Sequence, residues 1–399
     1  MPYIKVDGVD EVLDERLIAK TVMQSMTSTQ LRQLSAKSFS SIQIWLRAIL
    51  DNEGRILTRP AHVILFQNGP FDFVTGRRVS VSSSDFFPVR IQADYRIGID
   101  CQTPVFDQFL DDCAGGDQQV KRLIMAYLGY MISPCEPNRI FLFAPSAGSG
   151  KSVLGNFTRE LLGTNKTCAI ALQNFSKSFE LAQIFGKSAN FCMDISSAVL
   201  SDTTVAVLKR LSGGDPETVN AKYAQPFAYH NFAKLVFACN EGGIRLKTLD
   251  SGFERRLIVI PFRHSVDPED MDPDLPEKLW AERDGIVLQA VYALRKLYKN
   301  GYVFPQCKSG ESLKMQYIGN PNVSVQNFIE EVCMVSPEFK SWTAELYDQY
   351  LEHCKKNEYE PMSRIAFSRY LHSIPGVKSR KFQEQNCRGW GIEGLGLKS

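Results

Sequence analysis

The chain has 399 residues, more than a single hydrophobic core usually organises, so we expect two or three domains. Hydrophobic residues make up 44% and charged residues 23%, which is typical of an ordinary soluble globular protein. The formal net charge of +2 excludes a strongly basic or acidic chain, so any nucleic-acid surface has to come from local clustering of charge.

Cysteine and histidine give no sign of a metal site. The ten cysteines include no pair with C-x-x-C spacing, and several lie inside apolar runs, so we expect reduced, mostly buried thiols and no zinc. The five histidines are scattered. The N-terminus does not look like a signal peptide, and no apolar run approaches membrane-spanning length. We therefore expect a protein of the host-cell cytoplasm with no membrane partner.

The first part of the chain is expected to combine helices with a small sheet. Apolar residues recur near helical spacing in Leu13–Met26 and Ile42–Leu50, which predicts helix over residues 1–52. Two apolar runs, 63–66 and 71–74, are separated by turn residues, which predicts a hairpin.

The middle of the chain has the pattern of an α/β sheet. Residues 104–132 are helical in pattern, and from 139 to 262 short apolar runs alternate with helical segments. The strands expected in this sheet are Ile140–Phe143, Ala189–Met193, Lys234–Cys239 and Leu257–Ile260.

The segments after the sheet differ in composition. Residues 265–277 hold six acidic residues and three prolines, which predicts an exposed connector without regular helix. One or two helices are expected over 277–300, closed by a Gly at 301. A stretch rich in Pro, Gly and Ser, 305–322, is the expected domain boundary, and residues 323–399 predict two or three helices and a Gly-rich tail.

The stretch from Phe141 to Ser152 has the order strand, tight loop, helix. Its glycines let backbone N–H groups converge on phosphate oxygens, and the helix N-terminus adds positive partial charge. Lys151 is expected to reach the β- and γ-phosphates of a nucleotide, and the Ser152 hydroxyl to hold Mg²⁺. A chance Ser/Gly loop is the alternative, which the flanking strand and helix disfavour. The residues expected to bind the nucleotide are Ser146, Ala147, Gly148, Ser149, Gly150, Lys151 and Ser152.

A second acidic site is expected on a neighbouring strand, to hold Mg²⁺ and polarise water. Asp194 ends the apolar run Phe191-Cys192-Met193 about forty residues after the loop, and we favour the metal role over a helix N-cap. Asn240, at the end of another apolar run, is expected to orient water or contact the γ-phosphate, although Asn at a strand end is often a turn residue.

Basic residues follow in two places. Lys209 precedes Ser212-Gly213-Gly214-Asp215, and Lys222 and Tyr223 come next, a hairpin-like arrangement suited to gripping a phosphate backbone and stacking on bases. A solvated surface loop is the alternative. The pair Arg255-Arg256 stands at the entrance of a strand, where it suits donation to a neighbouring subunit's γ-phosphate or an ion pair with nearby acids.

In this order, these elements resemble a superfamily 3 helicase. They are most similar to the phage and plasmid primase–helicase branch, which is shared with poxviruses and other large DNA viruses. The Ser-Gly-Gly-Asp element is the most specific mark. Further segments that resemble the family are Phe66–Asp72, Thr103–Phe106, Leu279–Gly301 and residues 323–399.

The resemblance implies an α/β fold in which an AAA+-like P-loop ATPase core is flanked by an N-terminal α+β domain and a C-terminal winged-helix-like domain. It implies domains over 1–132 (oligomerisation), 133–304 (ATPase with the following helices) and 305–399 (DNA binding). It also implies a homohexameric ring with ATP and Mg²⁺ at the subunit interfaces.

The same resemblance assigns roles to single residues. Lys151 and Ser152 would bind nucleotide and Mg²⁺, Asp194 would be the acidic metal and water residue, and Asn240 the sensor. Arg255 or Arg256 would be the arginine finger, with Arg255 preferred. Lys222 would lie on the central-channel hairpin that contacts single-stranded DNA.

Three departures from the family pattern matter. Pro145 replaces the first glycine of the loop, Ile195 follows Asp194 where paired acids are usual, and no segment resembles a primase catalytic domain. A separate catalytic glutamate is therefore unassigned, and the chain is expected to be a helicase without priming activity.

The C-terminal segment supports DNA binding on separate grounds. Between residues 364 and 398, seven basic residues stand against two acidic ones. A helix, a turn and a basic strand with Lys378, Arg380 and Lys381 suit duplex binding through phosphate contacts. A solvated basic tail is the alternative.

Our leading hypothesis is an ATP-dependent, ring-forming DNA helicase that replicates a phage, plasmid or mobile genetic element. It would act on single- and double-stranded DNA with host or element replication proteins. A second hypothesis is an ATP-switched origin-binding initiator that recruits a host helicase, and a third is a DNA-binding regulator with an inactive nucleotide site.

Overall fold

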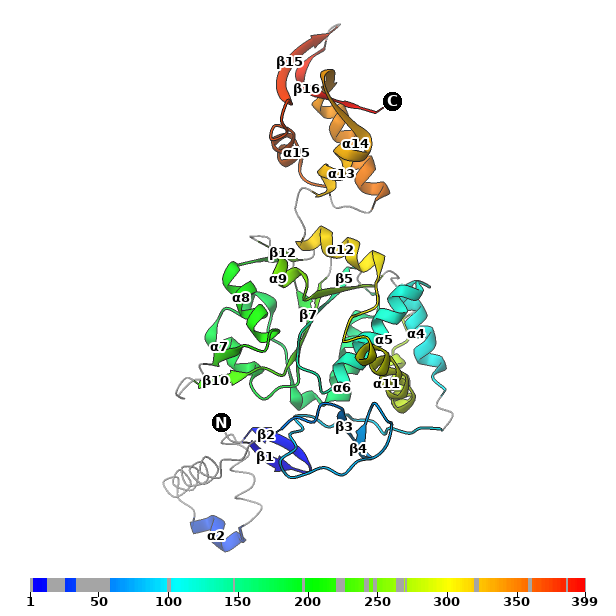
Figure 1. Ribbon diagram of the computed structural model, residues 1–399, viewed down its shortest axis with the longest axis vertical. Helices are drawn as coiled ribbons and strands as arrows, with labels where there is room; N and C mark the ends of the chain where they lie inside the picture. The colour runs from blue at the N-terminus through cyan, green and yellow to red at the C-terminus, as the bar shows by residue number, and fades with distance from the viewer. Residues whose placement is uncertain are drawn as a thin grey trace.

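A parallel sheet of five strands forms the centre of the molecule (Figure 1). The computed structural model describes residues 3–12, 26–33, 58–98, 102–145, 148–195, 198–219, 227–239, 244–246, 250–262, 269, 271–318, 323–357, 361–384 and 387–398. The strand order is β13-β5-β11-β7-β6, and every pairing is parallel. The strands are β5 (Ile140–Pro145), β6 (Thr167–Cys168), β7 (Ala189–Ile195), β11 (Lys234–Cys239) and β13 (Leu257–Phe262).

All four strands expected from the sequence are present, and the short β6 is an addition. Ile140 pairs with Leu235 on one side and Leu257 on the other, so β5, β11 and β13 begin level with one another. Because parallel strands begin level, their carboxyl ends meet at one edge, and the loop after β5 lies at that edge.

Helices cover both faces of the sheet. Successive β5 residues alternate between the two sides, with Phe141 and Phe143 in one buried cluster and Leu142 in the other. The first face is covered by α4 (Pro104–Ala114), α5 (Gln118–Ile132), α6 (Lys151–Leu162), α10 (Leu275–Ala281) and α11 (Arg283–Lys299). The second is covered by η2 (Leu172–Asn174), α7 (Ser178–Leu181), η3 (Ala182–Ile184), α8 (Asp202–Leu211), α9 (Ser251–Glu254) and α12 (Lys308–Ile318).

The first face is held together by a close crossing of α5 and α11. At Gly129 a Cβ atom would lie 2.6 Å from the carbonyl oxygen of Ala290 and 2.8 Å from the backbone nitrogen of Leu294. Only glycine fits this contact between two helix backbones. The helices expected over 104–132 and 277–300 are confirmed, each as a pair.

A buried lysine fixes the end of α5 against the sheet. Lys234, at the start of β11, is 2% exposed, and its ammonium group donates hydrogen bonds to the carbonyl oxygens of Tyr130, Met131 and Ser133. The Tyr130 carbonyl also accepts hydrogen bonds from the backbone N–H and the hydroxyl of Ser133. The lysine thus supplies donors to carbonyl groups at the end of the helix, where partners in a following turn are missing. Burial lowers the pKa of Lys234 to about 8.

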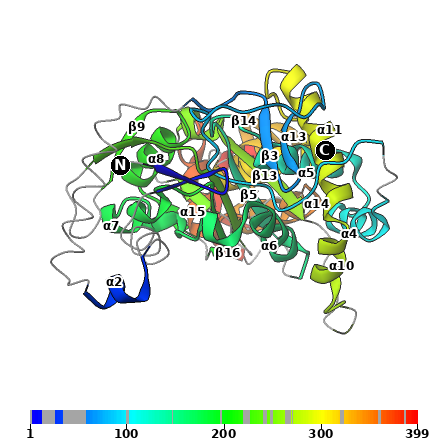
Figure 2. The same cartoon turned by 90° about the horizontal axis from the view of Figure 1, so that it is seen from below.

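The N-terminal part is an α+β region whose strands lie below the core in Figure 1 and in front of it in the view from below (Figure 2). It contains the hairpins β1 (Tyr3–Val6) with β2 (Val9–Val12) and β3 (Val63–Phe66) with β4 (Gly69–Asp72), and α2 (Ser28–Gln33). The second hairpin was predicted. The first corrects the expectation of helix, because Asp7 and Gly8 both adopt positive φ and close a tight turn. Residues 13–25 and 34–57 lie outside the described residues.

Hydrogen bonds of backbone and side-chain groups join this region to the core. The amide of Gln92 donates to the carbonyl of Leu161 in α6, and the amide of Asp94 donates to the carboxylate of Asp284 in α11. The Arg295 guanidinium of α11 donates to the carbonyl of Phe73. The N-terminal region therefore helps to position α6 and α11, and α6 begins directly after the nucleotide loop.

Two short strand pairs and a 3-10 turn complete the core. They are η1 (Thr164–Lys166), β8 (Ala198–Leu200) with β12 (Ile244–Leu246), and β9 (Pro216–Val219) with β10 (Phe227–His230). The α12 helix lies within 305–322, where the sequence suggested a break, and Gly310 packs against the carbonyl of Val259 on β13. The domain boundaries given from the sequence stay predictions.

The C-terminal part is a winged-helix-like module beyond α12 (Figure 1). Its sheet is antiparallel with the order β14-β16-β15, and its buried residues form a separate apolar cluster that includes Phe328, Tyr350 and Phe367. The elements are α13 (Val323–Val332), β14 (Cys333–Trp342), α14 (Thr343–Lys356), α15 (Arg364–Leu371), β15 (Lys378–Glu384) and β16 (Cys387–Leu397).

The fold class expected from the sequence is confirmed: an AAA+-like α/β core flanked by an N-terminal α+β part and a C-terminal winged-helix-like part. Among the described residues, no helix is long and apolar enough to cross a bilayer.

Candidate nucleotide site

A cavity of about 1040 Å³ opens at the carboxyl edge of the sheet, where β5 and β7 end. It lies between the loop after β5, helix α4 and the start of α10. The residues that line it are Pro104, Val105, Gln108, Phe109, Asp112, Cys113, Gly148, Ser149, Gly150, Lys151, Ser152, Val153, Met193, Asp194, Met271, Asp272, Leu275 and Lys278.

The loop that enters this cavity requires glycine. Gly148 and Gly150 have φ of 66° and 86°, values that L-residues with side chains rarely adopt. A Cβ on Gly150 would also lie 2.8 Å from the sulfur of Cys113 and 2.9 Å from the ring of Phe109. Helix α4 therefore packs directly against the loop and holds its backbone in place.

Lys151 begins helix α6, and its side chain is 6% exposed. Burial lowers the pKa of its ammonium group, because the charged form loses hydration. A phosphate at the helix N-terminus would stabilise that charge, since the first N–H groups of the helix and the ammonium group would bind the same anion. Ser152 is exposed beside it in the same cavity.

Asp194 lies on β7, and its exposed carboxylate lines the same cavity as Lys151 and Ser152. The approach of α6 to β7 is close, because a Cβ on Gly155 would lie 2.5 Å from the methyl carbon of Met193. A hydroxyl and a carboxylate are the oxygen ligands that Mg²⁺ takes when phosphates and water complete its shell. Within the described ranges, no cluster of three or more His, Cys, Asp or Glu side chains is placed to hold a metal.

Sequence reasoning missed one wall of the cavity. Val105, Gln108, Phe109 and Asp112 come from α4, and Leu275 from the start of α10. The alternation of apolar and polar residues along α4 indicates an amphipathic helix, but nothing in it indicates that the loop some forty residues later packs against it. The signal available was the resemblance at Thr103–Phe106.

The arginine pair lies at the opposite edge of the sheet from Lys151. The carbonyl of Arg256 accepts a hydrogen bond from the amide of Ile140, the first residue of β5. The six residues of β5 then separate the arginines from the loop by about 17 Å at roughly 3.3 Å per residue. Neither arginine reaches the cavity of its own chain.

The two arginines differ in their surroundings. Arg256 is half-buried and donates to the carbonyl of Gly252 (2.7 Å) and to that of Ser212 (3.4 Å). Burial, together with the neighbouring charge of Arg255, lowers its pKa. Arg255 is exposed.

The Ser-Gly-Gly-Asp element forms the base of a hairpin. A Cβ on Gly213 would lie 2.8 Å from the carbonyl of Lys209, and Gly214 has a φ of 79°. Glu217 on β9 pairs with Arg210 of α8 at 2.6 Å, and β9 pairs antiparallel with β10. These contacts fix the base of the β9–β10 hairpin, and residues 220–226 between its strands lie outside the described residues.

The other predicted residues fall in different places. Lys209 pairs with Asp250 at 2.9 Å, and this hydrogen bond lowers the pKa of Asp250. Its predicted contact with DNA stays a prediction. Five further predicted residues lie outside the described residues: Ser146, Ala147, Lys222, Tyr223 and Asn240.

The three predicted cations of the C-terminal strand do not share a face. Lys378, Arg380 and Lys381 are all exposed on β15. Arg380 pairs with Glu393 at 3.3 Å, whereas Lys381 lies opposite Trp390 with its ammonium group 5.1 Å from the ring centre. Because side chains alternate along a strand, Lys381 faces away from the other two.

Two segments of the chain match known protein families. Residues 6–115 match the family described as "D5 N terminal like". Residues 142–256 match the family described as "Family of unknown function (DUF5906)". The second match runs from the sheet strand before the nucleotide loop to Arg256.

Two relatives are similar in sequence. The uncharacterized mitochondrial protein ymf21 of Marchantia polymorpha is 30% identical over 145 residues, which are 33% of this chain and 79% of that protein. The putative helicase L207/L206 of Acanthamoeba polyphaga mimivirus is 26% identical over 309 residues, which are 68% of this chain and 32% of that protein. The chain thus spans about a third of the length of the viral relative.

Solved structures are similar at lower identity. The apo C-terminal region of NrS-1 gives a TM-score of 0.42 with 11% identity, covering 84% of this chain and 83% of that one. The JCV helicase gives a TM-score of 0.27 with 15% identity, covering 54% and 65%.

Proposed function

We propose a function on the premise that the chain belongs to the same protein family as the uncharacterized mitochondrial protein ymf21 of Marchantia polymorpha. It is an ATP-dependent DNA helicase, a ring-forming superfamily 3 motor that replicates a phage, plasmid or other mobile element. The viral relative is itself named a putative helicase, and the N-terminal match to the D5 family agrees with this role.

The observation that carries the proposal is the convergence of three groups on one cavity. The glycine loop, the buried ammonium group of Lys151 and the carboxylate of Asp194 all line it. A purely structural role needs no desolvated lysine at a helix N-terminus beside a carboxylate. ATP hydrolysis needs both, one to bind the phosphates and one to polarise water.

In this proposal each residue of the nucleotide site has its own role. Backbone N–H groups of the loop bind the β-phosphate, and Lys151 neutralises charge on the β- and γ-phosphates. Ser152 and Asp194 would hold Mg²⁺, which supplies further neutralisation of the triphosphate when bound. Asp194 also orients the attacking water, and Asn240 contacts the γ-phosphate. The apolar side chains of the wall from α4 and α10, Val105, Phe109 and Leu275, would limit the access of water to the site.

The arginine pair supports assembly into a ring. Since neither arginine reaches the cavity of its own chain, their use in catalysis requires a neighbouring copy. Arg255 is the finger, because its side chain is exposed, and Arg256 positions it through the carbonyls of Gly252 and Ser212. A homohexamer places each Arg255 at the next nucleotide.

The same contacts suggest how hydrolysis moves DNA. Arg256 is hydrogen-bonded to Ser212, which begins the turn leading into the β9–β10 hairpin. Lys222 and Tyr223 lie in the segment that joins these strands. A shift of the arginines on loss of the γ-phosphate is therefore passed to the segment that holds single-stranded DNA.

The test compares ATP hydrolysis and unwinding of a forked DNA by the wild type and by Lys151→Ala. We expect the variant to lose about 10²-fold or more in turnover, and all unwinding. Lys177→Ala, which removes an exposed lysine away from the cavity, should behave as wild type. A wild-type protein that hydrolyses ATP with DNA present but separates no strands contradicts the motor role.

The C-terminal module favours a second candidate, an ATP-switched origin-binding initiator. Its exposed basic strand suits duplex binding without translocation. The two candidates differ at Lys222: DNA-stimulated turnover that disappears in Lys222→Ala supports the motor, and turnover that does not change supports the initiator.

A further inference from the structure

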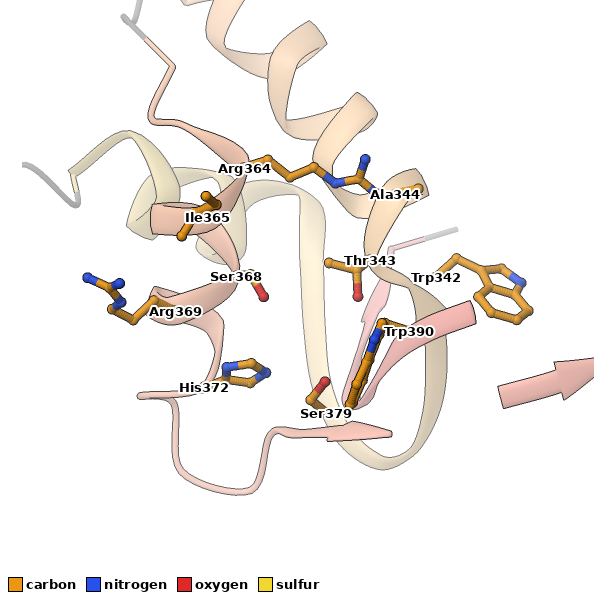
Figure 3. Close-up of a pocket in the computed structure, with 10 residues that line it drawn as sticks. All are labelled: Trp342, Thr343, Ala344, Arg364, Ile365, Ser368, Arg369, His372, Ser379 and Trp390. Carbon is orange, nitrogen blue, oxygen red and sulfur yellow. The ribbon is translucent and has the colours of Figure 1, made fainter. Parts of the chain in front are cut away.

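A pocket of about 990 Å³ opens on the C-terminal module between α15 and the β15–β16 hairpin (Figure 3). The start of α14 closes its remaining side. The residues that line it are Trp342, Thr343, Ala344, Arg364, Ile365, Ser368, Arg369, His372, Ser379 and Trp390. The nucleotide site uses none of these residues.

One wall of the pocket is an exposed aromatic face. Trp390 is 60% exposed, and across the pocket Ile365 is 74% exposed. The ammonium group of Lys381 lies 5.1 Å from the centre of the Trp390 ring, and the two residues are directly paired across β15 and β16. An indole held beside a cation presents a flat ring on which another ring can stack.

The pocket is also cationic. Figure 3 shows Arg364 extending across its upper side toward Ala344, with Ser368 and His372 pointing inward from α15. None of the described residues that line it is acidic. The nearby acid Glu393 pairs with Arg380, on the face of β15 that carries Lys378 and not Lys381.

We propose that this pocket binds an unpaired nucleobase of single-stranded DNA. The base stacks on Trp390, and the flanking phosphates contact Arg364 and Lys381. A duplex presents only base edges in its grooves, because the flat faces of its bases are stacked on one another. A stacking wall at the side of a concave pocket is therefore matched by a base that has left the stack.

This site extends the proposed DNA-binding function and needs neither ATP hydrolysis nor ring assembly. It would hold one separated strand on the outer module while the core acts on the DNA. Its test is a binding measurement without nucleotide, so that a failure of the motor role leaves the result interpretable.

The experiment measures binding of the full chain to a labelled oligothymidine of about 12 nucleotides. A strand of equal length and charge with abasic sugars serves as the comparison. We expect the wild type to bind the intact strand about 10-fold more tightly than the abasic strand. Trp390→Ala should bind both strands with the weaker affinity, and the intact strand should quench intrinsic tryptophan fluorescence more strongly in chains that keep Trp390 than in chains whose pocket retains Trp342 alone.

Two further variants separate stacking from other effects. Trp390→Phe should recover most of the affinity, because a phenyl ring also stacks, but not the part of the quenching that comes from Trp390. Tyr292→Ala removes another aromatic ring, 45% exposed and with Arg295 over it, and should bind as wild type. Equal affinity of wild type and Trp390→Ala for the intact strand overturns the proposal, and so does an equal loss by Trp390→Ala on intact and abasic strands.

Discussion

The cavity beside Lys151 and the pocket beside Trp390 have nearly the same volume, about 1040 and 990 Å³, but they are built in opposite ways. The lining of the first comes from segments that lie between Pro104 and Lys278. The lining of the second comes from neighbouring elements between Trp342 and Trp390. The first depends on the packing of the whole core, and the second on one small module.

The two sites also differ in the groups that would bind a ligand. In the first, backbone geometry and a buried charge do the binding, and the side chains that hold the loop, such as Phe109 and Cys113, are themselves buried. In the second, exposed side chains on a module with its own core do the binding. Changes in the core should therefore affect the first site alone, whereas a side chain such as Trp390 is replaceable without loss of fold.

The largest effect is expected from Arg255, which we propose completes the nucleotide site of a neighbouring copy. Arg255→Ala should lower ATP turnover about 10³-fold, since an arginine finger contributes about that much. Mixing inactive Arg255→Ala with inactive Lys151→Ala should restore part of the turnover, because some interfaces then combine an intact loop with an intact arginine. The measurement is steady-state hydrolysis at fixed total protein, for each variant and for the mixture.

Arg122→Ala is the control for this experiment. It removes an exposed arginine from α5 and should leave turnover unchanged. Wild-type turnover by Arg255→Ala, or no recovery in the mixture, would mean that the arginine does not act across an interface.

The sheet and the nucleotide loop were predictable because their signals are local. A fully buried parallel strand such as β11 appears as a continuous apolar run, and a loop that must cradle phosphate needs glycine and lysine at fixed spacing. The first hairpin was also within reach, since Asp7-Gly8 is a strong turn signal that the expectation of helix overrode.

Other features depend on tertiary contacts and were not predictable. Nothing near Gly150 in the sequence indicates that Phe109 and Cys113 limit the space around it. Likewise, the cross-strand register alone decides that Lys381 faces Trp390 while Arg380 faces Glu393. A charge count identified the strand as basic but not the separation of its two faces.

A smaller effect is expected from Gly129→Ala, which tests how far the first site depends on remote packing. The added methyl group would meet the backbone of α11 at Ala290, so the variant should lose about 1–3 kcal/mol of unfolding free energy in urea. ATP affinity should fall, because α5 and α11 support the helix that holds the loop. Binding of the oligothymidine should not change.

The matched change on the same helix is again Arg122→Ala, which should stay within about 0.5 kcal/mol of wild type. Weaker oligothymidine binding by Gly129→Ala would show that both sites depend on the packing of the core. The pocket beside Trp390 would then not be independent of the nucleotide site.

The smallest effect is expected in the C-terminal module, from the pH dependence of its stability. Cys333 is 3% exposed, and burial raises the pKa of its thiol to about 12 from 9.0. Above pH 9 the unfolded thiol loses its proton while the folded thiol keeps it. Its stabilising contribution is therefore complete below pH 9 and is lost as pH rises toward 12, by about 1 kcal/mol between pH 9 and 10.

Cys333→Ala should reduce that slope to the part that Cys354 and Tyr350 contribute, because burial raises the pKa of both. Val377→Ala, which deletes apolar volume from the same cluster but no thiol, should keep the full slope. The measurement is the unfolding free energy of the module in urea at about pH 8 and about pH 10. An equal slope in the two variants would mean that this thiol titrates alike in the folded and unfolded chain. In that case Cys333 is hydrated in solution, and the module lacks the closed apolar core that would let it hold Trp390 at its surface independently of the ATPase core.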